Sequence, residues 1–188
     1  MPGSLAKKCD KESASTLDVA DLSSICAKYL LNSAGAVNLG IYVRTDFGDW
    51  QVKAYVNHNL VEIEEQSLTI FEMLSGIAEF AGTNITNIPH VFSVEDLEEL
   101  IDEVPFFLDG YNFIYSPIAD GEEQSDVVLL VMGDKPFTVD QVDNMHEVAI
   151  CFAEHVSRAK SINNRMKRFF DEKDTGYGGY DSDSNFPF

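Results

Sequence analysis

The chain has 188 residues, of which 45% are hydrophobic, so its length and composition are those of one globular domain. Its 32 acidic residues outnumber 13 basic ones, which leaves a formal net charge of −19, and no Lys or Arg occurs between Lys53 and Lys135. Such a surface repels nucleic-acid backbones and anionic membranes, so we expect neither direct nucleic-acid binding nor membrane association.

We expect a soluble, cytoplasmic protein. No apolar run is long enough to cross a bilayer, and the N-terminal residues lack the apolar stretch of a signal peptide. We predict three parts: a flexible lead (residues 1–15), one domain (16–170) and a disordered tail (171–188).

The cysteines Cys9, Cys26 and Cys151 are widely spaced and match neither a CxxC pair nor a zinc pattern. We therefore expect reduced thiols in a reducing compartment and no metal site. Cys26 and Cys151 lie among apolar residues at helical spacing, so we expect both to be buried as small hydrophobic residues.

Hydrophobic periodicity predicts a helix, a hairpin and a second helix in the first part of the domain. The first helix spans residues 16–33, with Asp18 as a candidate cap. Alternating residues predict strands over 39–44 and 50–56, joined by a turn, and helical spacing returns over 67–81.

The second part of the domain has a similar alternation of elements. We predict a short strand over 90–92, an acidic helix over 93–104, and strands over 111–117 and 127–132. The longest helix follows over 139–170. Capping-box pairs open both helices: Ser93 with Asp96, and Thr138 with Gln141.

The last predicted helix is longer than a domain of this size needs. At about 1.5 Å per residue it spans ~50 Å, so its end is expected to extend past the domain. Apolar residues recur along it at spacings of three and four, and a second copy of the same helix would cover them. We predict a homodimer through the terminal helices, with these contact residues: Val156, Ala159, Met166 and Phe169.

The order of elements resembles the GAF family, a relative of PAS domains. The acidic helix leads through Asp109-Gly110 into a strand, and the strand VVLLVMGDKPFT (residues 127–138) passes into the helix VDQVDNMHEVAICFAEHV (139–156). The resemblance covers roughly residues 17–162. It implies an α/β (α+β) fold with a central antiparallel sheet, flanking helices and a long C-terminal helix. It also implies a small-molecule pocket between the sheet and the two central helices.

Five polar residues flank this implied pocket and are candidates to bind a ligand: His58, Asn59, Asn84, Asn87 and His90. Turn-forming Asn and exposed His explain them equally well. Bilin attachment and methionine sulfoxide reduction in the family require central cysteines, and none lies between Cys26 and Cys151. A nucleophile elbow, phosphate loop and metal motif are also missing, so we expect no catalytic residue and no cofactor.

The tail is too poor in apolar residues to form a core. Its end, DSDSNFPF, is similar to the C-terminal tip of bacterial single-stranded-DNA-binding proteins. The resemblance implies that an aromatic end docks in an apolar pocket while acids meet a basic ridge, through these residues: Asp181, Asp183, Phe186, Pro187 and Phe188. A solvated tail, or one folded back on the basic 158–168 segment, is the alternative.

We therefore expect a non-catalytic, GAF-like signalling adaptor that forms homodimers and binds a protein partner with a basic surface. A small-molecule sensor is one alternative. The other is an accessory factor of DNA replication or repair that is recruited through the Pro-Phe tail.

Overall fold

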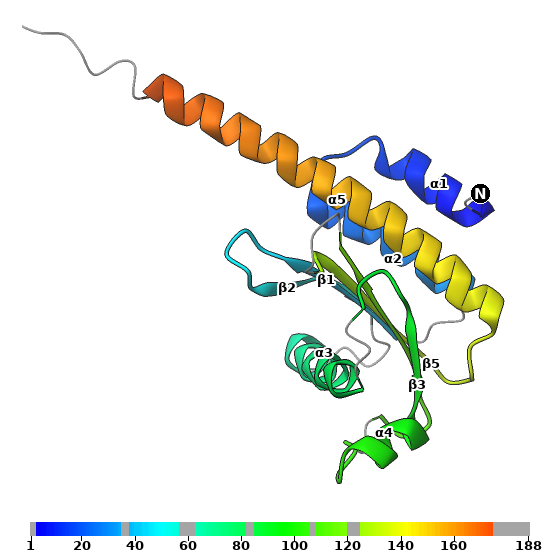
Figure 1. The fold of residues 1–188 in the computed structure, drawn as a ribbon. Coiled ribbons are helices and arrows are strands. Elements are labelled where there is room, and N and C mark those ends of the chain that lie inside the picture. The colour runs from blue at the N-terminus through cyan, green and yellow to red at the C-terminus, as the bar shows by residue number, and fades with distance from the viewer. Residues whose placement is uncertain are drawn as a thin grey trace, which may run out of the picture.

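The computed structural model describes residues 3–34, 38–56, 63–81, 85–105, 108–119 and 125–174. Within these ranges, helices cover both faces of a five-stranded antiparallel sheet with the strand order β2-β1-β5-β4-β3 (Figure 1). The elements are α1 Ser4–Ser13, α2 Val19–Ala34, β1 Asn38–Arg44, β2 Trp50–Val56, α3 Ile63–Phe80, β3 His90–Ser93, α4 Val94–Leu100, β4 Asn112–Ile118, β5 Val127–Gly133 and α5 Val139–Asp174. The predicted fold class is confirmed.

The central strand β5 explains the continuous apolar run in the sequence. Val127, Leu129 and Val131 enter the core that faces α2 and α5, whereas the alternate residues enter the core that faces α3. Successive side chains of a strand point to opposite faces, so a strand covered on both sides has no polar positions.

The first layer consists of α2 and α5, which pack together on one face of the sheet, with α1 beside them (Figure 1). Leu22, Leu30 and Phe152 are fully buried in this core. The start of α2 is held by Asp18, whose carboxylate accepts hydrogen bonds from the backbone N–H groups of Ala20 at 2.7 Å and Asp21 at 3.1 Å.

The N-terminal segment is a correction to the prediction, because residues 4–13 form α1 and not a flexible lead. Ala6, Cys9 and Ser13 are buried against the first core. Glu12 accepts hydrogen bonds from Lys28 Nζ at 2.9 Å and from the Tyr29 hydroxyl at 2.7 Å, which joins α1 to α2. Its fully buried residues are small, and Leu5 is only partly buried against the core, so hydrophobic periodicity gave little sign of a packed helix.

All three cysteines are reduced and buried in the first core, which confirms the prediction for Cys26 and Cys151 and adds Cys9. Burial raises the pKa of Cys26 well above its ordinary value. The hydrogen bond that Cys151 donates to Cys9 raises the pKa of Cys151 and lowers that of Cys9.

The second layer consists of α3 and α4 on the opposite face of the sheet (Figure 1). The predicted capping box opens α4, because Ser93 Oγ accepts from Asp96 N at 3.1 Å and Asp96 Oδ2 accepts from Ser93 N at 2.6 Å. The helix ends at Leu100, earlier than predicted, since Ile101 is extended with φ of −134°. The other helix of this layer, α3, begins at Ile63, which is before the predicted start at residue 67.

The last helix, α5, is 36 residues long and passes the predicted end at residue 170. Its predicted capping box is also present: Gln141 Oε1 accepts from Thr138 N at 2.8 Å, and Thr138 Oγ1 accepts from Gln141 N at 3.3 Å. Among the residues described, no helix combines the length and the apolar character that a membrane span requires.

Candidate functional site

Aromatic side chains fill the described part of the sheet face beneath α3, where the family resemblance implies a pocket. Phe71 stacks on Tyr42 with ring centroids 4.4 Å apart, and it meets Trp50 edge-on at 5.3 Å. A Cβ at Gly40 would lie 2.8 Å from the Tyr42 ring, so glycine at this position leaves room for the tyrosine. Phe71 is only 4% exposed, which makes it the central packing residue of this face.

Two of the five predicted ligand residues, Asn87 and His90, lie in the described part of the chain; His58, Asn59 and Asn84 lie outside it. His90 is opposite Tyr115 in the register of β3 and β4, with ring centroids 6.5 Å apart. The structure therefore places His90 beside the aromatic face.

Asn87 has a structural role at the end of β4. Its N–H donates to Pro117 O at 2.7 Å, and its Oδ1 accepts from Ala119 N at 2.9 Å. Its φ is +67°, a left-handed conformation that Asn tolerates better than most residues. These two bonds hold the end of β4, so Asn87 and His90 do not converge on one described site.

His146 of α5 lies next to Asn87. Its Nδ1 is 3.2 Å from Ser116 Oγ, and the imidazole hydrogen-bonds the backbone of Asn87. Burial lowers the pKa of His146 below its ordinary value, although this hydrogen bond opposes the shift.

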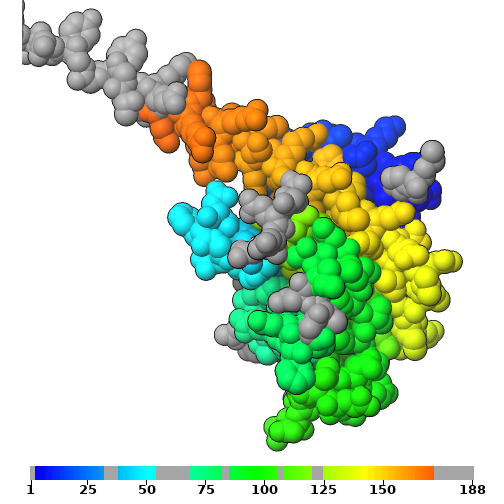
Figure 2. Space-filling view, viewed as in Figure 1, coloured from blue at the N-terminus to red at the C-terminus, as the bar shows by residue number. Residues whose placement is uncertain are grey.

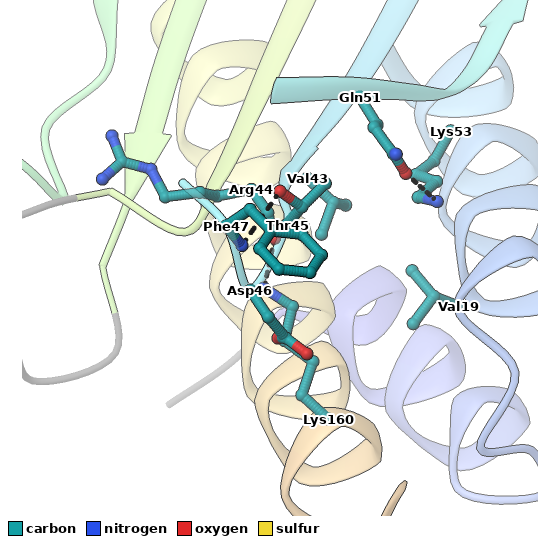
Figure 3. Close-up of a pocket in the computed structure, with 9 residues that line it drawn as sticks. All are labelled: Val19, Val43, Arg44, Thr45, Asp46, Phe47, Gln51, Lys53 and Lys160. Atoms are coloured by element: carbon teal, nitrogen blue, oxygen red, sulfur yellow. Dashed lines mark hydrogen bonds between the residues drawn. The ribbon is translucent and has the colours of Figure 1, made fainter. Parts of the chain in front are cut away.

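A basic hollow lies between the β1–β2 hairpin, the start of α2 and the middle of α5 (Figure 3). Its volume is about 270 Å³. The lining residues are Val19, Val43, Arg44, Thr45, Asp46, Phe47, Gln51, Lys53 and Lys160. Three of the nine are cationic and one is acidic, which makes this hollow a local exception in a strongly acidic protein.

Backbone and side-chain contacts set the positions of these cations. Lys160 donates to the carbonyl of Arg44, and Lys53 Nζ donates to Gln51 Oε1 at 2.7 Å. The Arg44 guanidinium lies over the Trp50 ring at 5.0 Å and points away from the other lining residues (Figure 3). The two lysines remain as positive charges at the hollow, where they attract a carboxylate or phosphate group.

A second hollow of about 530 Å³ shares Val19 and Lys53 with the first. It reaches Leu17 at the start of α2 and Asn163 of α5. Neither hollow can be read from the sequence, because α5 contributes residues more than a hundred positions away from the other lining segments.

The outer part of α5 is the most exposed helical segment of the described chain and projects from the body of the molecule (Figure 2). Between residues 161 and 171, only Ile162 is half-buried and the others are exposed. Met166 is 51% exposed, Phe169 55% and Phe170 58%. The prediction omitted Phe170, which follows Phe169 directly in the sequence.

Two of the four predicted dimer residues require a correction. Val156 is 1% exposed and Ala159 is 0% exposed, because both pack in the first core. They are thus occupied within the chain and do not offer a surface to a second copy. Met166 and Phe169, by contrast, are exposed. The five predicted tail residues, Asp181, Asp183, Phe186, Pro187 and Phe188, lie outside the described residues.

No family model matches the sequence, and no curated protein matches it. Several solved structures match in fold. The GAF domain of an Acinetobacter phosphoenolpyruvate-protein phosphotransferase has a TM-score of 0.60 at 12% identity, over 84% of this chain and 93% of that chain. A methyl-accepting chemotaxis protein, residues 122 to 287, has a TM-score of 0.59 at 14% identity, over 82% and 98%.

The GAF domain/HD domain protein from Geobacter sulfurreducens has a TM-score of 0.54 at 11% identity, over 77% of this chain and 95% of that chain. At these identities the likeness concerns the fold alone. The chain has a GAF-like fold.

Proposed function

We propose that this chain is a non-catalytic regulatory or adaptor domain that works as a homodimer formed through the outer part of α5. The observation that carries the proposal is the exposed apolar stripe of that helix. Ile162, Met166 and Phe169 follow one another at spacings of four and three, so they lie on one side of the helix.

A long exposed helix with an apolar stripe is unfavourable in an isolated chain. Segments of fewer than about 12–15 residues are marginal helices in water unless packing supports them. Pairing with the same stripe of a second copy buries the side chains of Met166, Phe169 and Phe170, and two-fold symmetry makes the surface self-complementary. The GAF-like fold, which also occurs in a chemotaxis protein, supports a signalling role.

The test is the mass in solution of the full chain. The monomer has a mass of 20.9 kDa, so sedimentation or light scattering of the proposed dimer gives twice that value. We expect the double substitution Met166→Glu and Phe169→Glu to return the mass to that of the monomer, because it places charges in the apolar contact.

Phe80 provides the matched control, since it is 82% exposed on α3, far from α5 in the fold. Phe80→Glu leaves the dimer intact if the contact is specific to α5. A monomeric wild-type protein at high concentration contradicts the proposal, and so does a dimer that the double substitution leaves unchanged.

The partner of the proposed adaptor is a protein with a basic surface. The support is the sequence of the tail, in which Asp181 and Asp183 precede Phe186, Pro187 and Phe188. Acidic residues followed by an aromatic end suit a basic ridge with an apolar pocket. Removal of residues 187–188 is expected to abolish capture of the partner without changing the mass of the dimer; capture that persists contradicts this role of the tail.

A second candidate function, sensing of a small anionic ligand, is favoured by the basic hollow of Figure 3. A ligand that binds only the folded state raises the melting temperature. We expect a carboxylate or phosphate compound from a thermal-shift panel to stabilise the wild-type protein but not Lys53→Ala. Lys135→Ala is the control, because Lys135 is exposed and does not line the hollow. Equal shifts in all three proteins contradict binding at this hollow.

A further inference from the structure

Three potential metal ligands, Asp10, Cys151 and His155, come together where α1 lies along α5 (Figure 1), and the thiol of Cys9 hydrogen-bonds that of Cys151 beside them. Cys151 and His155 are one turn apart on α5, so their side chains share one side of the helix. Cys9 and Asp10 are consecutive residues of α1. From the sequence we expected no metal site, because the cysteines match no CxxC pair or zinc pattern, and the single Cys-x₃-His spacing of Cys151 and His155 was not singled out.

The donor atoms of these residues are close together. One donor atom each from Asp10, Cys151 and His155 lies within 4.8 Å of the other two. The carboxylate of Asp10 is 2.9 Å from His155 Nε2, and the thiol of Cys151 hydrogen-bonds that of Cys9. In a tetrahedral zinc site the Zn–S bonds are about 2.3 Å and the Zn–N bonds about 2.0 Å, which separates the ligand atoms by roughly 3.3–3.8 Å. Small side-chain movements reach that spacing.

The burial of His155 is a separate sign of an incomplete polar site. The residue is only 7% exposed, and its Nδ1 atom is buried with no hydrogen-bond partner among the described residues. A buried nitrogen without a hydrogen-bond partner is unfavourable in a folded protein. In metal sites the two nitrogens of a histidine are both used, one for the ion and one for a neighbouring carboxylate or carbonyl.

The chemistry of the donors selects the class of ion. Thiolate and imidazole ligands favour zinc-like ions over Mg²⁺ and Ca²⁺, which prefer oxygen. Cys9 and Cys151 are buried, whereas the Asp10 side chain is 66% exposed, so an ion can enter from solvent past Asp10.

We propose that Cys151 and His155 of α5, together with Cys9 and Asp10 of α1, bind a thiophilic divalent cation of the Zn²⁺ type. The bound ion fastens α1 to α5 on the face of the sheet opposite α3. It is independent of the proposed dimer, because Cys9 and Cys151 lie in the first core, whereas Met166 and Phe169 are exposed on the outer part of α5.

Cobalt is the probe for the experiment, because Co²⁺ replaces Zn²⁺ in tetrahedral sites and absorbs visible light. Reduced, metal-free full-length protein is titrated with Co²⁺ under anaerobic conditions. We expect one equivalent to produce a sulfur-to-cobalt charge-transfer band and the strong visible bands of a tetrahedral site, and Zn²⁺ to bleach both. Zn²⁺ is also expected to raise the melting temperature of the wild-type protein.

The variants assign the ligands. Cys151→Ser and His155→Gln are expected to lose the charge-transfer band, and Asp10→Asn to weaken binding by roughly 10- to 100-fold. Asparagine has the same shape as aspartate, and the Asp10 side chain is largely exposed. The Asp10→Asn variant is therefore expected to fold even if a substitution of Cys151 or His155 unfolds the protein. Cys26→Ala is the matched control, since Cys26 is buried in the same core but is not among the converging donors, and it retains the spectrum.

Two outcomes overturn the proposal. The first is a titration with no sulfur-to-cobalt band, or with a band that survives both Cys151→Ser and His155→Gln. The second is a reduced protein that takes up no Co²⁺ but loses two thiols to air, which identifies Cys9 and Cys151 as a disulfide pair.

Discussion

Replacement of Phe71 by alanine tests whether the aromatic face beneath α3 is a packed core. Phe71 is 4% exposed and stacks on Tyr42, with Trp50 at its edge. Truncation of a buried Phe to Ala costs about 3–5 kcal/mol, because the transfer energy is lost and a cavity remains. The lost ring pairs account for about 0.5–1.5 kcal/mol each, beyond their buried area.

The assay is urea unfolding followed by circular dichroism. For a slope of about 2 kcal/mol per molar urea, the expected loss lowers the midpoint by roughly 1.5–2.5 M. The total stability of a domain is only about 5–15 kcal/mol, so the variant is strongly destabilised but still folds in the absence of urea if the wild type is not at the lower limit.

Phe80→Ala on the same helix is the control. Phe80 is 82% exposed, and surface substitutions of this kind usually change stability by less than about 0.5 kcal/mol. The reasoning is refuted if Phe71→Ala costs less than about 1 kcal/mol, or if both variants shift the midpoint equally.

Three further predictions concern polar contacts. The depressed pKa of His146 means that the unfolded state binds more protons below the ordinary value of 6.5, so stability is lost as pH falls through that region. His146→Gln removes this part of the loss, which urea titrations between pH ~8 and pH ~5 will detect as a smaller decline than in the wild type. At Asn87, alanine loses a hydrogen bond of about 0.5–1.5 kcal/mol and adds about 1–2 kcal/mol of left-handed strain, whereas glycine loses only the bond, so thermal melts are expected to rank Asn87→Ala below Asn87→Gly. Ser93→Ala removes the cap of α4 at a cost of about 0.5–2 kcal/mol, and hydrogen exchange is expected to accelerate in the first turn of that helix while α3 stays protected.

Local patterns in the sequence were sufficient for most of the fold. The run of residues 127–132 predicted a strand, and the pairs at Ser93 and Thr138 located two helix starts. These features depend on neighbours within a few positions, because strand alternation, helical spacing and capping are short-range. The order of such elements was also the basis of the resemblance to GAF domains.

The candidate sites depended on tertiary structure. Val156 and Met166 belong to the same apolar stripe in the sequence, yet one is buried in the chain and the other is exposed. Nothing in the spacing shows where the body of the domain ends along α5.

The cluster at Cys151 shows the same limit at longer range. The spacing of Cys151 and His155 is visible in the sequence, but the contact between His155 and Asp10, which are 145 positions apart, is not. By itself, the sequence determined most of the helices and strands, although not α1, and it determined which of their faces are apolar and where the acidic and basic residues fall. Only the tertiary structure decided which segments meet, because contacts between distant segments depend on packing and leave no period in the chain.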